Sequence, residues 1–305
     1  MADEPQHISV MPVEVDEALA LRPGAVVVDA TLGLGGHAQT MAEKIGPQGH
    51  LIGIDQDDAA IAIARGRLQG FKGRLDIVKS NFSRMDKVLS DLGVAAVDAV
   101  LFDLGVSSMQ FDSPQRGFSF RTEGPLDMRM DAESSTSAED LVNEASEQEL
   151  ADLIFQYGEE RFARRIARHL VAARAGARIR TTTQLADIVL RSLPRGYQRD
   201  RLHPATRTFQ ALRIAVNREL EVLPEALGIA FKNLKPGGRM AVISFHSLED
   251  RIVKEAFKAL WRQGRATLLT KKPLIPAEAE AADNPRARSA KMRAIERVVE
   301  HGELS

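Results

Sequence analysis

The chain has 305 residues, of which 44% are hydrophobic, and a net charge of −1, so a substantial core can form and intrinsic disorder is not expected. It contains no cysteine, which excludes disulfides, thiolate metal sites and a cysteine nucleophile. The acidic start of the chain does not resemble a signal peptide, and no apolar run is long enough to span a bilayer. We therefore expect a soluble, cytoplasmic protein that does not bind membranes.

Strands and helices alternate over the first hundred residues. The β-branched run 24–29 ends on Asp29 and then breaks into glycines at 33, 35 and 36, which predicts a strand, a tight turn and a helix. The same kind of pattern predicts further strands at 51–55, 75–79 and 97–102, with helices at 59–68 and 85–92. The fold class is therefore α/β, a doubly wound, Rossmann-like sheet whose candidate site residues follow the strand ends.

The glycine spacing of the first turn distinguishes between cofactors. Dinucleotide sites carry G-x-G-x-x-G, whereas Gly33-Leu34-Gly35-Gly36 lacks the third spaced glycine. S-adenosylmethionine has no pyrophosphate and needs no such cradle. Asp55 lies 20 residues after Gly35, where a carboxylate reaches ribose hydroxyls. The turn therefore favours S-adenosylmethionine, with a nicotinamide dehydrogenase as an alternative.

The alternation stops after the fourth strand. Residues 112–135 have loop composition, and helices are predicted at 146–157, 159–174, 184–193 and 206–223. Residues 131–160 hold ten acidic residues and no basic one, whereas residues 161–218 hold fourteen Arg, no Lys and two Asp. This asymmetry predicts a surface that binds a polyanion, although some of the arginines could instead pair with the preceding acidic segment.

The α/β pattern then resumes. A helix at 224–234, a turn at 235–238 and a buried strand at 239–245 are predicted, followed by strands at 266–270 and 292–299 that the Pro-rich stretch 271–290 joins. The predicted domains are therefore a cofactor-binding domain made of residues 1–112 and 219–305, and an inserted helical, Arg-rich substrate domain at 113–218.

Asp103 follows the fourth strand, where methyltransferases that act on amino groups place an acidic or amide residue. The lone pair of an exocyclic amine is delocalised into its ring, and an acceptor for its N–H helps it to attack a methyl group. The Pro-Pro-aromatic sequence that follows this residue in DNA amino-methyltransferases is absent here. Phe82 could stack on an adenine and His246 could orient a base, and the aromatic residues that could stack on the target base are Phe111, Phe118, Phe120, Tyr157, Tyr197 and Phe245.

Seven blocks of the sequence resemble the MraW family of 16S ribosomal RNA methyltransferases. They are His7–Pro12, Asp29–His37, Asp103–Ser108, Pro125–Met130, Arg207–Arg213, Ser244–Asp250 and Asn284–Lys291. The resemblance implies a class I S-adenosylmethionine-dependent methyltransferase that modifies the N4 amine of a cytosine in the decoding region. It implies cofactor contacts at Gly35, Gly36, His37, Asp55, Phe82, Asp103 and Gln110. Beside these, we expect a cofactor contact at Gly33, catalysis at Asp103, and substrate contacts at Phe118, Arg129, Arg207, Arg213 and His246.

Three other functions stay open beside this one: a DNA amino-methyltransferase, an RNA-binding or assembly factor without catalysis, and the dehydrogenase. The missing cysteine disfavours methylation of a ring carbon, which usually proceeds through a cysteine adduct. No metal is expected, because no set of His, Asp and Glu has metal-ligand spacing. The expected partner is 16S ribosomal RNA or the small subunit, and a homodimer is one of the oligomeric states left open.

Overall fold

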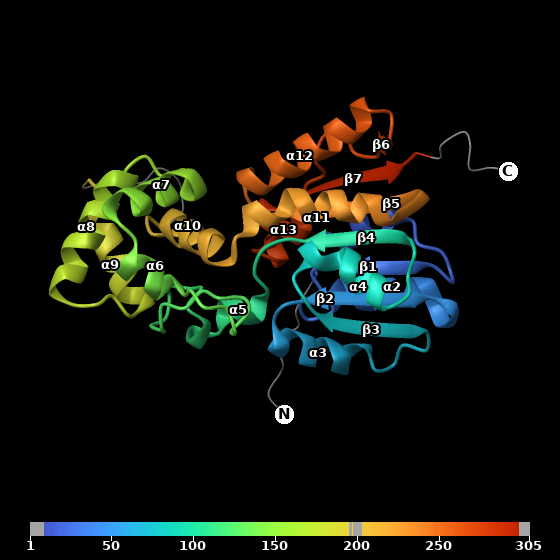
Figure 1. Cartoon of the computed structure of the whole chain (residues 1–305), viewed down its shortest axis with the longest axis horizontal. Helices are drawn as coiled ribbons and strands as arrows, with labels where there is room; N and C mark the ends of the chain where they lie inside the picture. Colours follow the sequence, from blue (N-terminus) through green and yellow to red (C-terminus); the bar gives the residue numbers. More distant parts are fainter. Residues whose placement is uncertain (1–8, 195–196, 198–202, 299–305) are drawn as a thin grey trace. The chain divides into compact units, whose positions relative to one another are not determined.

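The computed structural model describes residues 9–194, 197 and 203–298, and the chain forms two compact units (Figure 1). The first, which we call the α/β unit, consists of residues 1–105 and 220–305, and the second, the helical unit, of residues 106–219. His7, Ile8 and Val299, which belong to predicted features, lie outside the described residues. The assignment of the two predicted domains to cofactor and substrate stays a prediction.

A seven-stranded sheet of order β3-β2-β1-β4-β5-β7-β6 forms the centre of the α/β unit. The strands are β1 (Val26–Asp29), β2 (His50–Asp55), β3 (Arg74–Lys79), β4 (Val97–Asp103), β5 (Leu234–Ser244), β6 (Ala266–Leu268) and β7 (Lys291–Arg297). Strands β1 to β5 run parallel, and β7 pairs antiparallel with both β5 and β6. The predicted α/β sheet is thus confirmed.

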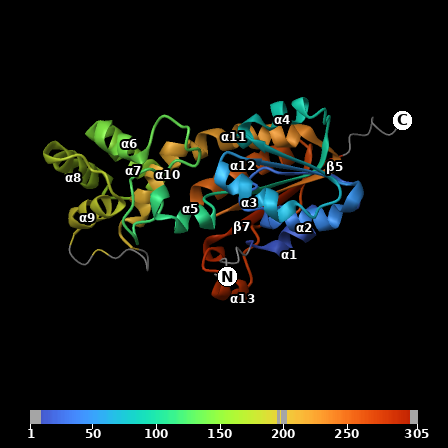
Figure 2. The ribbon, with the colours of Figure 1, turned by 90° about the horizontal axis from the view of Figure 1, so that it is seen from below.

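Helices cover both faces of this sheet (Figure 2). One face packs against α1 (Pro12–Leu19), α2 (Gly36–Ile45) and α3 (Asp58–Leu68), and the other against α4 (Met85–Asp91), α11 (Glu219–Asn233) and α12 (Ser247–Arg262). Because both faces are covered, the central strands are apolar at nearly every position, as Val97–Phe102 shows. Short one-turn segments also occur at η1 (Gly46–Gln48), η2 (Phe82–Arg84) and η4 (Ala287–Ser289).

Two sequence predictions in this unit are wrong in detail. The break expected at Pro224 lies instead at Arg218, whose left-handed backbone (φ 52°) ends α10 (Thr206–Asn217), so that Pro224 stands inside α11. The turn expected at 235–238 is part of β5, because the register with β4 shifts between Val97 and Ala99 and the intervening Lys-Pro-Gly-Gly is accommodated as an irregularity.

The stretch between β6 and β7 also contains more structure than its composition suggested. Residues 278–283 form α13 (Glu278–Asp283). The Glu280 carboxylate accepts a 2.7 Å hydrogen bond from the backbone N–H of Met11, which precedes α1. A linker in the sequence therefore serves as a support for the first described residues of the chain.

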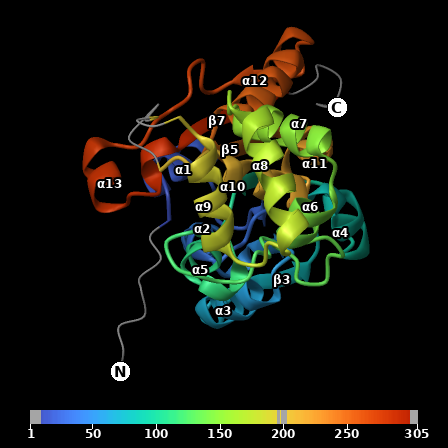
Figure 3. The same cartoon turned by 90° about the vertical axis from the view of Figure 1, so that its left-hand side faces the viewer.

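The helical unit, whose helices are drawn in Figure 3, has its own hydrophobic core. Its helices are α5 (Ser108–Asp112), α6 (Ala138–Glu144), α7 (Glu147–Gly158), α8 (Ala163–Gly176), α9 (Thr182–Ser192) and α10, with the turn η3 (Pro114–Arg116) after α5. Capping boxes begin four of these helices, at Ser107, Ser137, Ser146 and Thr181, because each side chain accepts the N–H of the third helical residue. Apolar residues at helical spacing, such as Ile166 and Leu170, then form the core.

Asn217 joins the loop 112–135 to the last helix of this unit. Its side-chain amide donates to the carbonyl oxygens of Met128 and Arg213, at 2.8 and 2.9 Å, and its oxygen accepts the N–H of Met130 at 2.8 Å. Met128 has a left-handed backbone (φ 62°), so these bonds hold a strained turn. Among the described residues, no helix is long and apolar enough to cross a membrane.

Candidate functional site

Three carboxylates lie at one edge of the sheet. Strands β1, β2 and β4 end on Asp29, Asp55 and Asp103 respectively, and these strands are neighbours in the sheet. Parallel strands bring their carboxyl ends to the same edge, which is where open α/β sheets bind ligands. The predicted clustering of Asp55 and Asp103 with the glycine turn is therefore present, and Asp29 joins them.

The glycine turn after β1 is fixed to the end of β2. The N–H of Leu32 donates to the carbonyl oxygen of Ile54 at 2.9 Å, and the N–H of Gly33 donates to Asp55 Oδ2 at 2.7 Å. Gly35 has φ +78° and precedes α2, and a Cβ there would lie 3.2 Å from the Cβ of Ala64 on α3. Gly35 is therefore required by backbone conformation and by close helix packing, and Gly36 begins α2.

Asp55 is held by backbone donors. Besides Gly33, the N–H of Asp57 donates to its Oδ1 at 2.9 Å. Burial raises the pKa of Asp55, and the hydrogen bonds from Asp57 and Gly33 oppose that rise. Each carboxylate oxygen accepts two hydrogen bonds readily, so the pair of oxygens keeps further acceptor capacity beyond these N–H groups.

Asp103 has an unsatisfied carboxylate oxygen. Its backbone N–H donates to Thr31 Oγ1 at 2.6 Å, and its Oδ2 lies 3.7 Å from Nε2 of His37, the second residue of α2. Its Oδ1 is buried and has no hydrogen-bond partner among the described residues. The Asp103 side chain as a whole is 23% exposed to solvent. A buried acceptor without a partner is rare in folded proteins, and a bound donor would satisfy it.

The electrostatic setting of Asp103 comes from burial and two charged residues. Burial raises the pKa of Asp103 to about 7, with the charge of Arg286 opposing the rise and that of Glu249 adding to it. Burial likewise raises the pKa of Asp29, which is 1% exposed, to about 7, although the N–H of Thr31 donates to its Oδ1 at 3.2 Å. Two carboxyl groups at this edge thus titrate near neutral pH, a feature common at functional sites.

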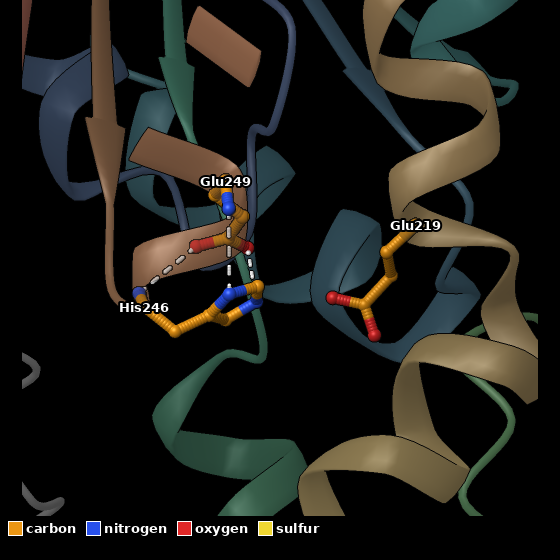
Figure 4. A group of neighbouring side chains, drawn as sticks. All are labelled: Glu219, His246 and Glu249. Atoms are coloured by element: carbon orange, nitrogen blue, oxygen red, sulfur yellow. Dashed lines mark hydrogen bonds and ion pairs between the residues drawn. The ribbon is translucent and has the colours of Figure 1, made fainter. Parts of the chain in front are cut away.

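The turn after β5 is built around His246 and Glu249 (Figure 4). Glu249, 2% exposed, accepts the N–H groups of Phe245 and His246 at 2.8 and 3.3 Å, and its own N–H donates to His246 Nδ1 at 3.4 Å. His246 therefore caps α12, and a neutral ring carries its proton on Nε2. That nitrogen lies 3.2 Å from Glu249 Oε1 without hydrogen-bond alignment, and it has no hydrogen-bond partner among the described residues.

Sequence reasoning missed Glu249 and Arg286. Glu249 stands three residues after His246, the spacing of a capping box, which is the signal that could have identified it. Arg286 lies in the Asn284–Lys291 block but 183 positions from Asp103, and nothing in the local sequence pattern connects the two.

Phe82 follows β3 at the start of η2, where Asn81 caps the turn by accepting the N–H of Ser83 at 3.0 Å. Its half-buried ring meets Phe102 of β4 edge to face, with centroids 5.6 Å apart. Packing against the core thus orients one side of the ring. Its predicted contact with an adenine stays a prediction.

The other predicted site residues belong to the helical unit. Gln110, 5% exposed, accepts the N–H of Ser107 at 3.0 Å in the capping box of α5. Phe118 is 5% exposed and packs in the core, which gives it a structural role. Arg129 forms a two-point pair with Asp127, with bonds of 2.9 and 2.6 Å, and its charge lowers the pKa of that carboxyl group against the effect of burial.

The remaining two arginines are also engaged within this unit. Arg207 donates to the carbonyl oxygen of Glu159 at 3.0 Å. Arg213 makes a two-point pair with Glu219, at 2.9 Å for each bond, and both side chains are mostly buried. The predicted substrate contacts of Phe118, Arg129, Arg207 and Arg213 stay predictions, beside these structural roles.

Both interpretations of the Arg-rich segment have support. Arg178 of the segment that follows α8 pairs with Glu139, Asp140 and Glu144, and Arg168 lies 3.8 Å from Glu147. By contrast, three arginines near the start of α8, at 161, 164 and 165, are exposed. Ion pairs with arginines therefore engage part of the acidic segment 131–160. The three exposed arginines could still bind a polyanion. Within either unit taken alone, no three His, Asp or Glu side chains of the described residues converge to within 4.8 Å of one another.

Comparison with known proteins relates the whole chain to one family. The model of the MraW methylase family matches residues 4–298. Proteins named ribosomal RNA small subunit methyltransferase H are 52% identical in Citrifermentans bemidjiense, over 96% of this chain and 98% of the relative, and 52% identical in Geobacter sulfurreducens, over 96% and 99%. The relative of that name in Methylobacterium nodulans is also 52% identical, over 97% and 92%.

Among solved structures, an rRNA methylase from Streptococcus thermophilus matches with a TM-score of 0.45 and 12% identity, over 98% of this chain and 99% of that one. The similarity to these relatives covers 96% of the chain or more and so includes both units. The chain belongs to the MraW methylase family.

Proposed function

We propose that this protein transfers a methyl group from S-adenosylmethionine to the N4 amino group of a cytosine in the decoding region of bacterial 16S ribosomal RNA. The observation that carries the proposal is Asp103: a carboxylate at the end of β4 with a buried, unsatisfied oxygen beside the glycine turn. Membership of a methylase family and relatives named for the small-subunit RNA support the same reaction.

The residues at the sheet edge fit S-adenosylmethionine. The glycine turn with Gly33, Gly35, Gly36 and His37 would hold its amino-acid end, and Asp55, with acceptor capacity left, would bind its ribose hydroxyls. Phe82 would lie against the adenine, and the resemblance adds Gln110 and Asp103. When bound, this cofactor supplies a methyl group on a positively charged sulfur, so the chemistry requires neither a metal nor a covalent enzyme intermediate.

Asp103 would act by accepting a hydrogen bond from the amine. An acceptor on the N–H frees the nitrogen lone pair from the ring, and a fixed carboxylate provides it without reorganisation. Only the ionised carboxylate accepts at both oxygens, and the raised pKa of Asp103 makes its ionisation sensitive to nearby positive charge. The positive charge of Arg286 lowers the pKa of Asp103 and so favours the ionised carboxylate. The Nε2–H of His246 would donate to an acceptor on the base.

The helical unit would hold the RNA. Its exposed arginines near the start of α8 offer charge to phosphates without base specificity. Single-stranded or splayed bases are the usual targets of sequence-specific RNA chemistry, and only an unstacked cytosine could reach a carboxylate at a sheet edge. With this substrate, the protein would act in the cytoplasm.

The test offers labelled S-adenosylmethionine with unmodified small ribosomal subunits, naked 16S RNA and duplex DNA, followed by nucleoside digestion and mass spectrometry. We expect N4-methylcytidine from RNA. Label in DNA alone would replace the proposal with a DNA amino-methyltransferase, and bound cofactor without any transfer would leave an RNA-binding factor. Asp103→Asn should abolish most transfer while RNA binding persists, whereas the exposed control Asp91→Asn should leave both unchanged.

A further inference from the structure

Helix α12 presents a basic face that the proposed reaction does not use. Arg251, Lys254, Lys258 and Arg262 follow one another at spacings of three and four residues, which puts them on one side of the helix. The opposite side carries Val253 and Phe257, which are 1% and 2% exposed and pack in the core of the α/β unit. We call Arg251, Lys254, Lys258, Trp261 and Arg262 the α12 basic face.

Positive charge predominates on α12 beyond its first turn. Residues 251–262 contain four Lys or Arg and a single acidic residue, Glu255, whereas Glu249 and Asp250 of the first turn are mostly buried. Lys254 Nζ lies 3.0 Å from Glu255 Oε1. The pKa of Glu255 is lowered by the hydrogen bond from Lys254 and by the charges of Lys254, Lys258 and Arg262. The single negative charge of Glu255 therefore lies near three positive charges, those of Lys254, Lys258 and Arg262, and cannot neutralise them all.

An exposed aromatic side chain completes the face. Trp261 is the only tryptophan of the chain, and it is 53% exposed although large aromatic residues are usually mostly buried. In helical projection it lies beside Lys254, at the border between the cations and the buried side of the helix. Aromatic side chains within a positively charged track are the recurring means of binding single-stranded nucleic acid, because every base has a face on which they can stack.

We propose that the α12 basic face binds a single-stranded segment of the substrate RNA, with the cations on successive phosphates and Trp261 stacked on a base. This inference rests on the proposed function, since it assigns a second contact surface for the same RNA. The helix starts directly after His246 at the strand edge and has 16 residues, so it extends about 24 Å away from that edge. RNA flanking the target cytosine could follow it.

The packing of α12 favours RNA over a membrane surface. A helix that lies on a bilayer buries its apolar side among lipid chains. Here Val253 and Phe257 are already buried against the sheet, and Trp261 is the one large hydrophobic residue of the helix that is exposed. The α12 basic face thus offers positive charge but no broad apolar side, which suits binding to the phosphates of RNA.

The test compares two triple variants of the full-length protein that remove equal charge from the same unit. The test variant is Lys254→Gln, Lys258→Gln, Arg262→Gln, and the control variant changes exposed lysines elsewhere, Lys72→Gln, Lys87→Gln, Lys232→Gln. Binding of unmodified 16S RNA is measured from 50 to 300 mM salt. The test variant should lose on the order of tenfold or more in affinity at physiological salt, and its salt slope should fall by about 2, because each phosphate contact on a single strand contributes about 0.7. The control should match the wild type.

Further readouts separate docking from chemistry. In methyl transfer, the test variant should raise the KM for RNA and leave kcat at saturating RNA unchanged, since these side chains do not touch the reacting atoms. Trp261→Ala should weaken binding of a single-stranded RNA oligonucleotide at least about fivefold, and Trp261→Phe should retain most of it.

The outcomes of this experiment also distinguish the two proposals. Equal RNA affinity of the test and control variants would overturn the inference whether or not transfer occurs. A wild type that fails to methylate RNA but binds it through this face would refute the proposed function alone. Loss of binding to phosphatidylglycerol vesicles, with RNA binding intact, would replace the RNA surface with a membrane surface.

Discussion

The buried carboxyl group of Asp29 should make the stability of the α/β unit fall as pH rises. Its side chain lies at the end of β1 with 1% exposure, and burial raises its pKa from 3.8 to about 7. The folded protein therefore holds a proton there that the unfolded chain releases above pH 4. Stability from this group is complete below the unfolded pKa and is lost progressively until the pH passes the folded pKa.

The size of the effect follows from the shift. A rise of about three pKa units corresponds to on the order of 4 kcal/mol of unfolding free energy, of which roughly 3 kcal/mol would be lost between pH 5 and pH 8. Asp29→Asn keeps the oxygen that accepts the N–H of Thr31 but cannot ionise, so it should remove this loss. The variant should be more stable than the wild type at pH 8, and the advantage should shrink toward pH 5.

The assay is urea unfolding of both proteins at several pH values between 5 and 8. Asp103 titrates in the same range, so a smaller slope should remain in the variant. Asp91→Asn, in an exposed i,i+4 pair with Lys87, serves as the control and should follow the wild-type curve within a few tenths of a kcal/mol. Parallel stability curves for the wild type and Asp29→Asn would refute the reasoning.

Three further predictions address the site and the scaffold. The rate of methyl transfer at low RNA concentration should rise through about pH 7 as Asp103 ionises, and a pH profile of kcat/KM without that limb would contradict its role as acceptor. Gly35→Ala should destabilise the α/β unit by about 1–2 kcal/mol in thermal unfolding because of its φ of +78° and the contact with Ala64, whereas Gly66→Ala inside α3, where nothing lies within 4 Å, should stabilise it by up to about 1 kcal/mol. Asn217→Ala should destabilise the helical unit by roughly 2–3 kcal/mol, because it leaves the N–H of Met130 and the carbonyl oxygen of Met128 without their partner. Proteolysis of the loop 112–135 should then become faster, and an unchanged rate of cleavage would argue against this role of Asn217.

The strand ends were predictable from the sequence because each parallel strand is an apolar run that stops at a carboxylate. Val26 to Asp29 and Val97 to Asp103 show this most clearly, and the topology then brings their ends together. The MraW resemblance covered the chain and is confirmed by the family model. The roles of individual site residues stay predictions.

Features that depend on distant partners could not be predicted. Pro224 looked like a helix end, but a left-handed backbone at Arg218 had already separated the two helices. Arg286 acts on Asp103 from a distant part of the chain, and Arg178 is drawn to the carboxylates of α6 only because the helical unit packs them together. Local patterns specify elements, whereas these interactions arise only once the elements have packed.

The position of β7 has a consequence for how the chain matures during synthesis. This strand lies inside the sheet between β5 and β6 although it is the last to be translated, and the pairing of β4 with β5 joins Val97 to Leu234 across the entire helical unit. The helical unit is one continuous segment and can fold as soon as it leaves the ribosome, but the sheet cannot be completed until β7 has emerged. Ribosome-bound chains that end at Arg262 should therefore protect residues 106–219 from protease while leaving β1 to β5 cleavable. A newly made molecule would thus complete its sheet only after its helical unit has folded.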